Sequence, residues 1–236
     1  MLAVGTDRYE DARLPDLAFA AADARNLVQG LAAAPTRYYS AVETRLIENE
    51  PDLGDRLPIE LERMRVAAKP GDTVLIHFAG HGLLDEKGRF YLAGGATKGA
   101  DIAGTALAWD DVVSRLARFE ARVVVLLDAC HSGAADAATN DDAVDVLLAS
   151  SNLPFAVLSA SKGRQPSLES KLFGGGIFTT TVLDALTSAD TDIDGNGTVE
   201  LAELFAVAKR GVVAATDGRQ TPWLARSRFV GEVPLF

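Results

Sequence analysis

Residues 121–133, ARVVVLLDACHSG, contain the most apolar run of this 236-residue chain. A short run of β-branched and aliphatic residues bounded by turn signals is typical of a strand that is buried on both faces. The segment DTVLIHFAGHG at 72–82 begins in the same way. Helical patterns alternate with these strand patterns along the chain, which predicts an α/β fold with a mostly parallel sheet and helices on both faces.

The elements expected from these patterns form one domain, residues 1–236, because no linker divides the chain convincingly. We expect strands at 2–5, 43–49, 72–82, 121–133, 155–161 and 227–235, and helices at 16–33, 55–68, 109–118, 176–188 and 201–214. A short hairpin element is expected at 89–93, and a surface loop at 134–152.

Composition excludes several classes of function. The net charge of −10, from 33 acidic and 23 basic residues, disfavours nucleic acid as a partner and is compatible with basic peptides or cations. The single cysteine excludes an internal disulfide and a cysteine-rich zinc site, and it suits a reducing compartment. The sequence has no signal-peptide pattern and no apolar run of the roughly 18 residues that span a bilayer, so a cytoplasmic protein without membrane contact is expected.

Two expected strands end in residues that carry chemistry. His81 lies between Gly80 and Gly82, and the only cysteine, Cys130, lies in DACHSG. Parallel strands present their carboxyl ends at one edge of a sheet, where ligands bind, so these two side chains are expected at the same edge. A thiolate nucleophile with an imidazole base is the basis of cysteine peptidase chemistry, and the amides of Gly82 and Cys130 are candidate oxyanion donors.

Structural interpretations of these residues compete with the catalytic one. A lone cysteine often serves as a small buried hydrophobe, and a lone histidine often has its hydrogen bonds satisfied in the core. The presence of both at glycine-flanked strand ends favours catalysis. His77 precedes His81 by an even number of residues, so its geometry leaves a catalytic role open, although its apolar neighbours favour packing. His131 is interpreted as structural.

The motifs together resemble a known family. Five segments resemble the caspase and metacaspase clan of cysteine peptidases, and bacterial caspase-like proteins in particular. These segments are the opening 2–27, HFAGHG at 77–82, LLDACHSG at 126–133, SASKGRQPSLES at 159–170 and RQTPWL at 219–224. The resemblance implies the caspase-hemoglobinase fold, a three-layer sandwich with a mostly parallel six-stranded sheet. It also implies that His81 and Cys130 are the catalytic dyad, that Gly82 and Cys130 form the oxyanion hole, and that the chemistry requires no cofactor.

The same resemblance bears on which bond is cut. Asp128 occupies the position that is glutamine in Asp-specific caspases and aspartate in metacaspases, which implies Arg or Lys at P1, and the segment 14–17 offers no pocket arginine. Glu169 falls on a position that is usually acidic, whereas Gly163 stands where metacaspases usually have a second acid. Asp128 could instead be a structural acid bonded to backbone amides. The alternatives are an Asp-specific protease and a calcium-responsive interaction module without turnover.

The loop after the candidate nucleophile bears on activation. Residues 134–161 contain no Lys or Arg, so a protease with basic P1 specificity could not cut itself there. We therefore expect either a constitutively active enzyme or activation by Ca²⁺, a partner protein or an upstream protease.

Residues 192–203, DIDGNGTVELAE, match the twelve-residue EF-hand loop at its defining positions. The candidate calcium ligands are Asp192, Asp194, Asn196, Thr198 through its carbonyl, Glu200 and Glu203. Hard oxygen ligands in this order favour Ca²⁺ over zinc. The alternative is an Asx-rich turn that caps the next helix without metal, and only one such loop is present although EF-hands usually work in pairs.

Overall fold

The computed structural model describes residues 1–34, 39–131, 155–161, 165, 167–170, 174–225 and 233–235, and for Cys130 and His131 it describes the backbone alone. The surface loop expected at 134–152 lies outside the described residues.

The centre of the fold is a sheet whose main path has six strands, in the order β10-β7-β6-β3-β1-β2. These strands are β1 (Leu2–Gly5), β2 (Arg45–Glu48), β3 (Thr73–Leu84), β6 (Arg122–His131), β7 (Ala156–Ser159) and β10 (Trp223–Ala225). All neighbours on this path are parallel except β10, which pairs with β7 in the antiparallel sense at the edge. The mostly parallel six-stranded arrangement is therefore confirmed.

Two short antiparallel strands, β4 (Phe90–Leu92) and β5 (Leu107–Ala108), extend the sheet from β3 and bring it to eight strands. A separate antiparallel pair is formed by β8 (Glu169–Ser170) and β9 (Gly175–Gly176). Because β4 pairs with residues 82–84, β3 continues beyond the point where the sequence suggested a turn.

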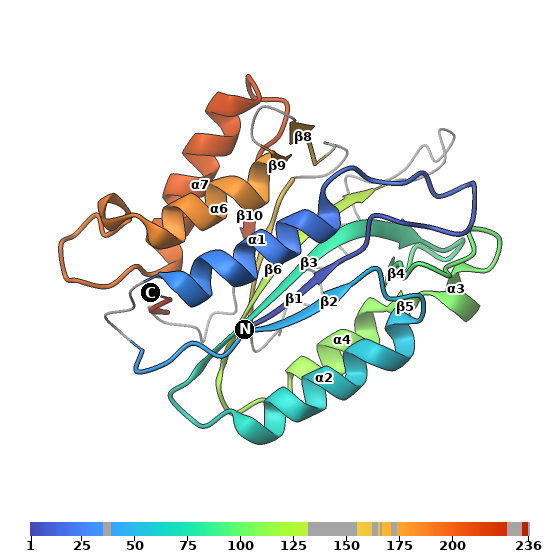
Figure 1. The fold of residues 1–236 in the computed structure, drawn as a ribbon, viewed down its shortest axis with the longest axis horizontal. Helices are drawn as coiled ribbons and strands as arrows, with labels where there is room; N and C mark the ends of the chain where they lie inside the picture. The colour runs from blue at the N-terminus through green and yellow to red at the C-terminus, as the bar shows by residue number, and fades with distance from the viewer. Residues whose placement is uncertain are drawn as a thin grey trace.

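Helices cover both faces of the sheet, as Figure 1 shows. One face carries α1 (Ala20–Ala33), α6 (Ile177–Thr187) and α7 (Leu201–Ala215), and the other carries α2 (Leu53–Ala67) and α4 (Trp109–Leu116). A short helix α3 (Ile102–Thr105) and a 3-10 turn η1 (Ala189–Thr191) complete the described elements.

The strands alternate their side chains between two cores. In β6, Val123, Val125 and Leu127 join the core under α2 and α4, whereas Val124 and Leu126 join the core under α1, α6 and α7. Successive side chains of a strand point to opposite faces, so a continuous apolar run fills both cores. This explains why the two most apolar runs of the sequence became the central strands.

One expected boundary is wrong for an identifiable reason, and most of the last expected strand lies outside the described residues. The first helix begins at Ala20 rather than residue 16, because the Asp16 carboxylate accepts hydrogen bonds from the Tyr9 amide and Arg8 and so belongs to a loop. The last strand pairs at Trp223–Ala225, directly after Pro222, a residue that suits the start of an edge strand. Within the expected range 227–235, Pro234 forms only an isolated bridge with Glu200, and residues 226–232 lie outside the described residues.

Candidate active site

The parallel ladder between β3 and β6 aligns the two candidate catalytic residues. His81 and Cys130 are register partners, and Gly82 pairs with His131 one step further on. Both residues lie inside paired strands rather than in turns beyond them, which corrects the sequence expectation, because the ladder continues through Gly82. The side chain of Cys130 lies outside the described residues. The backbones of the expected dyad are thus side by side at one edge of the sheet.

The imidazole of His81 is held in a defined tautomer. Its Nε2 lies 2.7 Å from the Pro15 carbonyl oxygen, and because a carbonyl only accepts hydrogen bonds, Nε2 carries the proton. Nδ1 therefore has a free lone pair, and it is buried without a hydrogen-bond partner among the described residues. Burial lowers the pKa of His81, against smaller raising effects of the Pro15 bond and Glu169, so the ring is neutral near pH 7. A neutral imidazole with a free Nδ1 can accept a proton.

Tyr9 fixes the position of His81 from a second side. The two rings lie 4.5 Å apart at their centroids, and the Tyr9 hydroxyl accepts a hydrogen bond of 2.9 Å from the His81 amide while it donates to the Thr6 carbonyl. Neither this contact nor the Pro15 carbonyl was predicted from the sequence, because both join the loop before α1 to β3 across the fold. The ring and the backbone of His81 are therefore held by separate contacts.

Packing accounts for Gly82. A Cβ at Gly82 would lie 2.6 Å from two ring atoms of Phe90, so no larger residue fits without displacing that ring. Gly82 does not have a positive φ. The need for glycine here comes from close packing in the sheet rather than from an unusual backbone conformation.

Asp128 lies close to two other carboxylates, Asp23 and Glu169. Both Asp23 and Asp128 are buried, with exposed fractions of 3% and 7%, and Glu169 is on β8. The negative charge of Glu169 contributes to raising the pKa of both aspartates, which indicates its proximity to them. In the described part of the chain, no Lys or Arg forms an ion pair with any of the three. Among the described residues, this acidic cluster has no basic partner, and the charge of Glu169 also acts on the nearby His81.

Each carboxylate of the cluster is anchored differently. Asp128 accepts hydrogen bonds from the hydroxyls of Ser167 and Thr179. Both oxygens of Asp23 accept the Gly176 amide, at 3.0 and 2.9 Å. Glu169 accepts the amides of Ala18 and Phe19, just before α1. The anchors come from two regions far apart in the sequence, residues 18–19 and residues 167–179.

Burial and the negative charge of Asp128 raise the pKa of Asp23 to about 8, and burial raises the pKa of Asp128. Asp23 was not singled out from the sequence. The signal was an acidic residue on the apolar stripe that Ala20, Ala24 and Leu27 form on α1.

The expected calcium loop has a compact arrangement of its acidic groups. Carboxylate oxygens of Asp192, Asp194 and Glu203 lie within 4.8 Å of one another, and the Gly197 amide donates to Asp192 Oδ2 at 2.8 Å. The other oxygen of Asp192, Oδ1, is buried and has no hydrogen-bond partner in the described part of the chain. The set of hard oxygens and this orphaned atom fit a divalent cation.

The capping alternative for the same loop is also visible. Glu200 and Glu203 form a capping box at the start of α7, and Glu203 Oε1 accepts the Ile193 amide at 2.6 Å. Asn196 donates to Glu200 Oε1 at 2.8 Å and to Asp194 Oδ2 at 3.2 Å, and its own Oδ1 accepts the Thr198 amide. The same carboxylates can thus either cap the helix or hold a cation.

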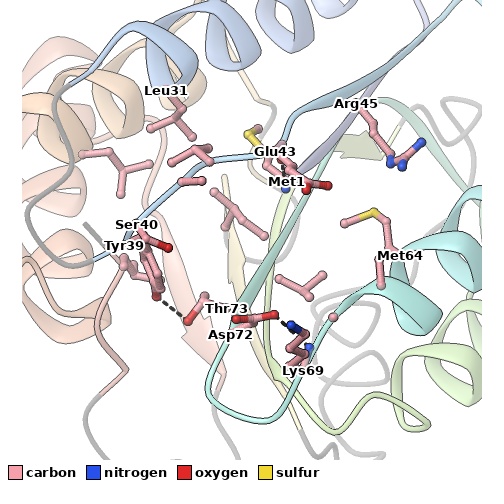
Figure 2. Close-up of a pocket in the computed structure, with 18 residues that line it drawn as sticks. Met1, Leu31, Tyr39, Ser40, Glu43, Arg45, Met64, Lys69, Asp72 and Thr73 are labelled. Carbon is pink, nitrogen blue, oxygen red and sulfur yellow. Dashed lines mark hydrogen bonds between the residues drawn. The ribbon is translucent and has the colours of Figure 1, made fainter.

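Figure 2 shows a pocket of about 400 Å³ that lies at the amino end of β3, whereas His81 lies toward the carboxyl end of that strand. It is lined at the amino ends of β1 and β3 by residues that include Met1, Thr73 and Val74. Catalytic groups in parallel sheets lie at the carboxyl ends of strands, so this pocket is separate from the candidate active site.

The described elements define an α/β protein with a mostly parallel sheet between two layers of helices, and this sheet aligns the backbones of His81 and Cys130. The family model of the caspase domain matches residues 2–233, and this chain belongs to that family of cysteine peptidases. A search of curated proteins found no match. No helix among the described residues is long and apolar enough to cross a membrane.

Solved structures share the fold at low sequence identity. A protein from Geobacter sulfurreducens is 15% identical, with a TM-score of 0.67, and the match covers 98% of this chain and 93% of that one. Caspase-1 from Spodoptera frugiperda is 11% identical, with a TM-score of 0.64 and coverage of 98% and 89%. The Drosophila initiator caspase Dronc is 11% identical, with a TM-score of 0.60 and coverage of 98% and 80%. These likenesses confirm the caspase-like three-layer fold.

Proposed function

We propose that this protein is a cysteine endopeptidase that cuts after Arg or Lys, with Cys130 as nucleophile and His81 as general base. The acidic cluster of Asp23, Asp128 and Glu169 carries the specificity, because a guanidinium or ammonium is the ligand that such a cluster stabilises. An Asp-specific protease is disfavoured, since a P1 carboxylate would meet a cluster of acidic groups.

In the proposed mechanism, Nδ1 of His81 takes the proton of the Cys130 thiol, and the thiolate attacks the scissile carbonyl. The amides of Gly82 and Cys130 stabilise the oxyanion. The C–N bond breaks as His81 returns its proton to the leaving amine, which yields a thioester and a free amine. Water, deprotonated by His81, then hydrolyses the thioester and regenerates the thiol. The hydrogen bond from Nε2 to the Pro15 carbonyl stabilises the imidazolium that forms between these steps.

A panel of peptides that differ only at P1 tests this function. We expect kcat/KM for Arg and Lys to exceed that for Asp by at least about 10²-fold, because burying like charges together costs several kcal/mol. A preference for Asp would support the Asp-specific alternative. No cleavage of any peptide, with or without Ca²⁺, would instead support a non-catalytic interaction module.

We further propose that residues 192–203 bind Ca²⁺ through Asp192, Asp194, Asn196, the Thr198 carbonyl, Glu200 and Glu203. The buried, unpartnered Asp192 Oδ1 supports this proposal, because a cation would satisfy it. Since the loop 134–161 contains no basic residue, Ca²⁺, a partner or another protease remains the proposed route of activation, unless the enzyme is constitutively active.

Calorimetric titration with Ca²⁺ is expected to show one binding site per chain, with a Kd between about 10⁻⁷ and 10⁻³ M. Asp192→Asn should weaken binding at least about tenfold, because it removes the negative charge and one of the two oxygens of this ligand. Asp190→Asn, on the neighbouring turn η1 and outside the loop positions, is the matched control and should bind as the wild type does. Equal binding by both variants, or no heat at all, would favour the helix-capping interpretation.

A further inference from the structure

Three buried side chains form a hydrogen-bonded series that ends at Asp128 of the acidic cluster. His77 on β3, Thr179 in the first turn of α6 and Asp128 on β6 have exposed fractions of 0%, 3% and 7%. His77 Nε2 lies 3.0 Å from Thr179 Oγ1, and Thr179 Oγ1 lies 2.8 Å from Asp128 Oδ2. The peptidase mechanism above makes no use of His77 or Thr179.

The direction of the hydrogen bonds in this series follows from the donors available. A carboxylate only accepts, so the single hydroxyl proton of Thr179 points to Asp128. Oγ1 must then accept from His77, which fixes His77 as the tautomer with its proton on Nε2. Burial lowers the pKa of His77 to about 3, so the ring stays neutral across the physiological range.

The behaviour of Thr179 differs from that of two other threonines in α6, Thr181 and Thr187. Thr181 and Thr187 donate to the carbonyls four residues earlier, Ile177 and Leu183, as helical threonines commonly do. Thr179 instead donates to Asp128 while it accepts from His77. The histidine supplies a donor that an apolar core residue would lack, and this donor selects the hydroxyl orientation that serves Asp128.

The second oxygen of Asp128 is held from the opposite side. Asp128 Oδ1 accepts the Ser167 hydroxyl, and Gln220, which is fully buried, donates to Ser167 Oγ at 3.3 Å and to the Ala160 carbonyl at 3.0 Å. Both oxygens of the carboxylate are therefore oriented by hydroxyls that are themselves anchored.

We propose that His77 and Thr179 are positioning residues for P1 recognition, which hold the Asp128 carboxylate charged and oriented for a basic side chain. This inference rests on the proposed peptidase function. Among the described residues, the titratable groups that act on Asp128 are Asp23 from α1 and Glu169 from β8, and both are acidic. The hydrogen bonds from His77 to Thr179 and from Thr179 to Asp128 therefore oppose the tendency of these acids to keep Asp128 protonated.

Kinetics of Thr179→Val test the proposal, with Thr179→Ser as the matched control that keeps the hydroxyl. Thr179→Val is expected to lower kcat/KM for P1-Arg peptides by about 10- to 100-fold, mainly through KM, because a buried carboxylate loses a hydrogen bond. Cleavage of a matched peptide with an uncharged P1, and alkylation of Cys130 by iodoacetamide, should stay within about twofold of the wild type. The acid limb of the P1-Arg profile should move to higher pH, since the lost bond stabilised the charged form.

His77→Leu and His77→Gln provide a second test in case Thr179→Val folds poorly. His77→Leu should show the same P1-selective loss at about 5- to 10-fold, and His77→Gln, whose amide can donate to Thr179, should recover part of it. A folded Thr179→Val with unchanged P1-Arg kinetics and pH profile, or an equal loss on charged and uncharged P1 peptides, would overturn the inference alone. Failure of the wild type to cleave P1-Arg peptides would overturn the proposed function and the inference with it.

Discussion

Replacing Cys130 with Ala is expected to lower kcat/KM on P1-Arg peptides by at least about 10⁴-fold, because the proposed acyl-enzyme cannot form without the thiolate. His81→Ala should cause a loss of similar size, since the thiol then has no base and the leaving amine no acid. Effects of residues that act as a unit are not additive, so the double variant should be no slower than either single one by more than a few-fold. Steady-state kinetics on one peptide measure all three.

Tyr9→Phe is the matched control for His81→Ala, because it keeps the ring that stacks on the imidazole and removes only the hydroxyl that accepts the His81 amide. A loss of no more than about tenfold is expected. Full activity of a folded His81→Ala protein would contradict the assignment, and would direct attention to another base.

Replacing Asp23 with Asn is expected to lower kcat/KM for P1-Arg peptides by about 10²-fold while it leaves cleavage after an uncharged P1 within a few-fold. Asp23 lies in the acidic cluster, and a basic side chain bound there would favour its ionised form. Since burial and Asp128 raise the pKa of Asp23 to about 8, substrate binding should release a proton near neutral pH. Wild-type kcat/KM for P1-Arg peptides should therefore rise as the pH passes from about 6 to 8.

The same shift predicts how stability depends on pH. In the unfolded chain the Asp23 carboxyl has its ordinary pKa of 3.8, so it loses its proton above about pH 4, whereas the folded state keeps this proton up to about pH 8. The free energy of unfolding therefore falls as the pH rises from about 4 to 8. This fall is on the order of 5 kcal/mol and should be smaller in Asp23→Asn. Denaturant unfolding at pH 5 and 8 measures it. Asp217→Asn, an exposed site at φ 50° that Asn tolerates, is the control; an unchanged pH dependence in Asp23→Asn would contradict the assignment.

The fold was largely predictable because the central strands β3 and β6 are long, apolar and buried on both faces. Runs such as Val123–Leu127 have no alternative position in a chain that folds in water. The predictions missed the start of α1, where the hydrogen bonds of Asp16 place it in a loop, and the strand β10, which directly follows Pro222. Side-chain hydrogen bonds such as those of Asp16 are not revealed by periodicity.

The candidate site was predictable only in part. The motifs identified His81, Gly82 and Asp128, and the ladder aligns the backbones of His81 and Cys130. The Pro15 carbonyl that fixes the imidazole tautomer was missed, because a backbone oxygen has no signature in the sequence. Asp23 was missed for a different reason: its place on the apolar stripe of α1 indicates burial, but its role depends on α1 and β9 meeting β6, which the sequence does not reveal.

The most direct test of the Cys–His peptidase assignment is peptide mapping by mass spectrometry after incubation with a peptidyl chloromethyl ketone that carries Arg at P1, from which the thiolate displaces chloride to form a stable thioether. Because Cys130 is the only cysteine, a thiol adduct has a single site. We predict stoichiometric modification of Cys130 in the wild type, at least about 10²-fold slower modification in His81→Ala, and little reaction with the matched reagent that carries Asp at P1. Equal rates for wild type and His81→Ala, in proteins that react equally with iodoacetamide, would contradict it.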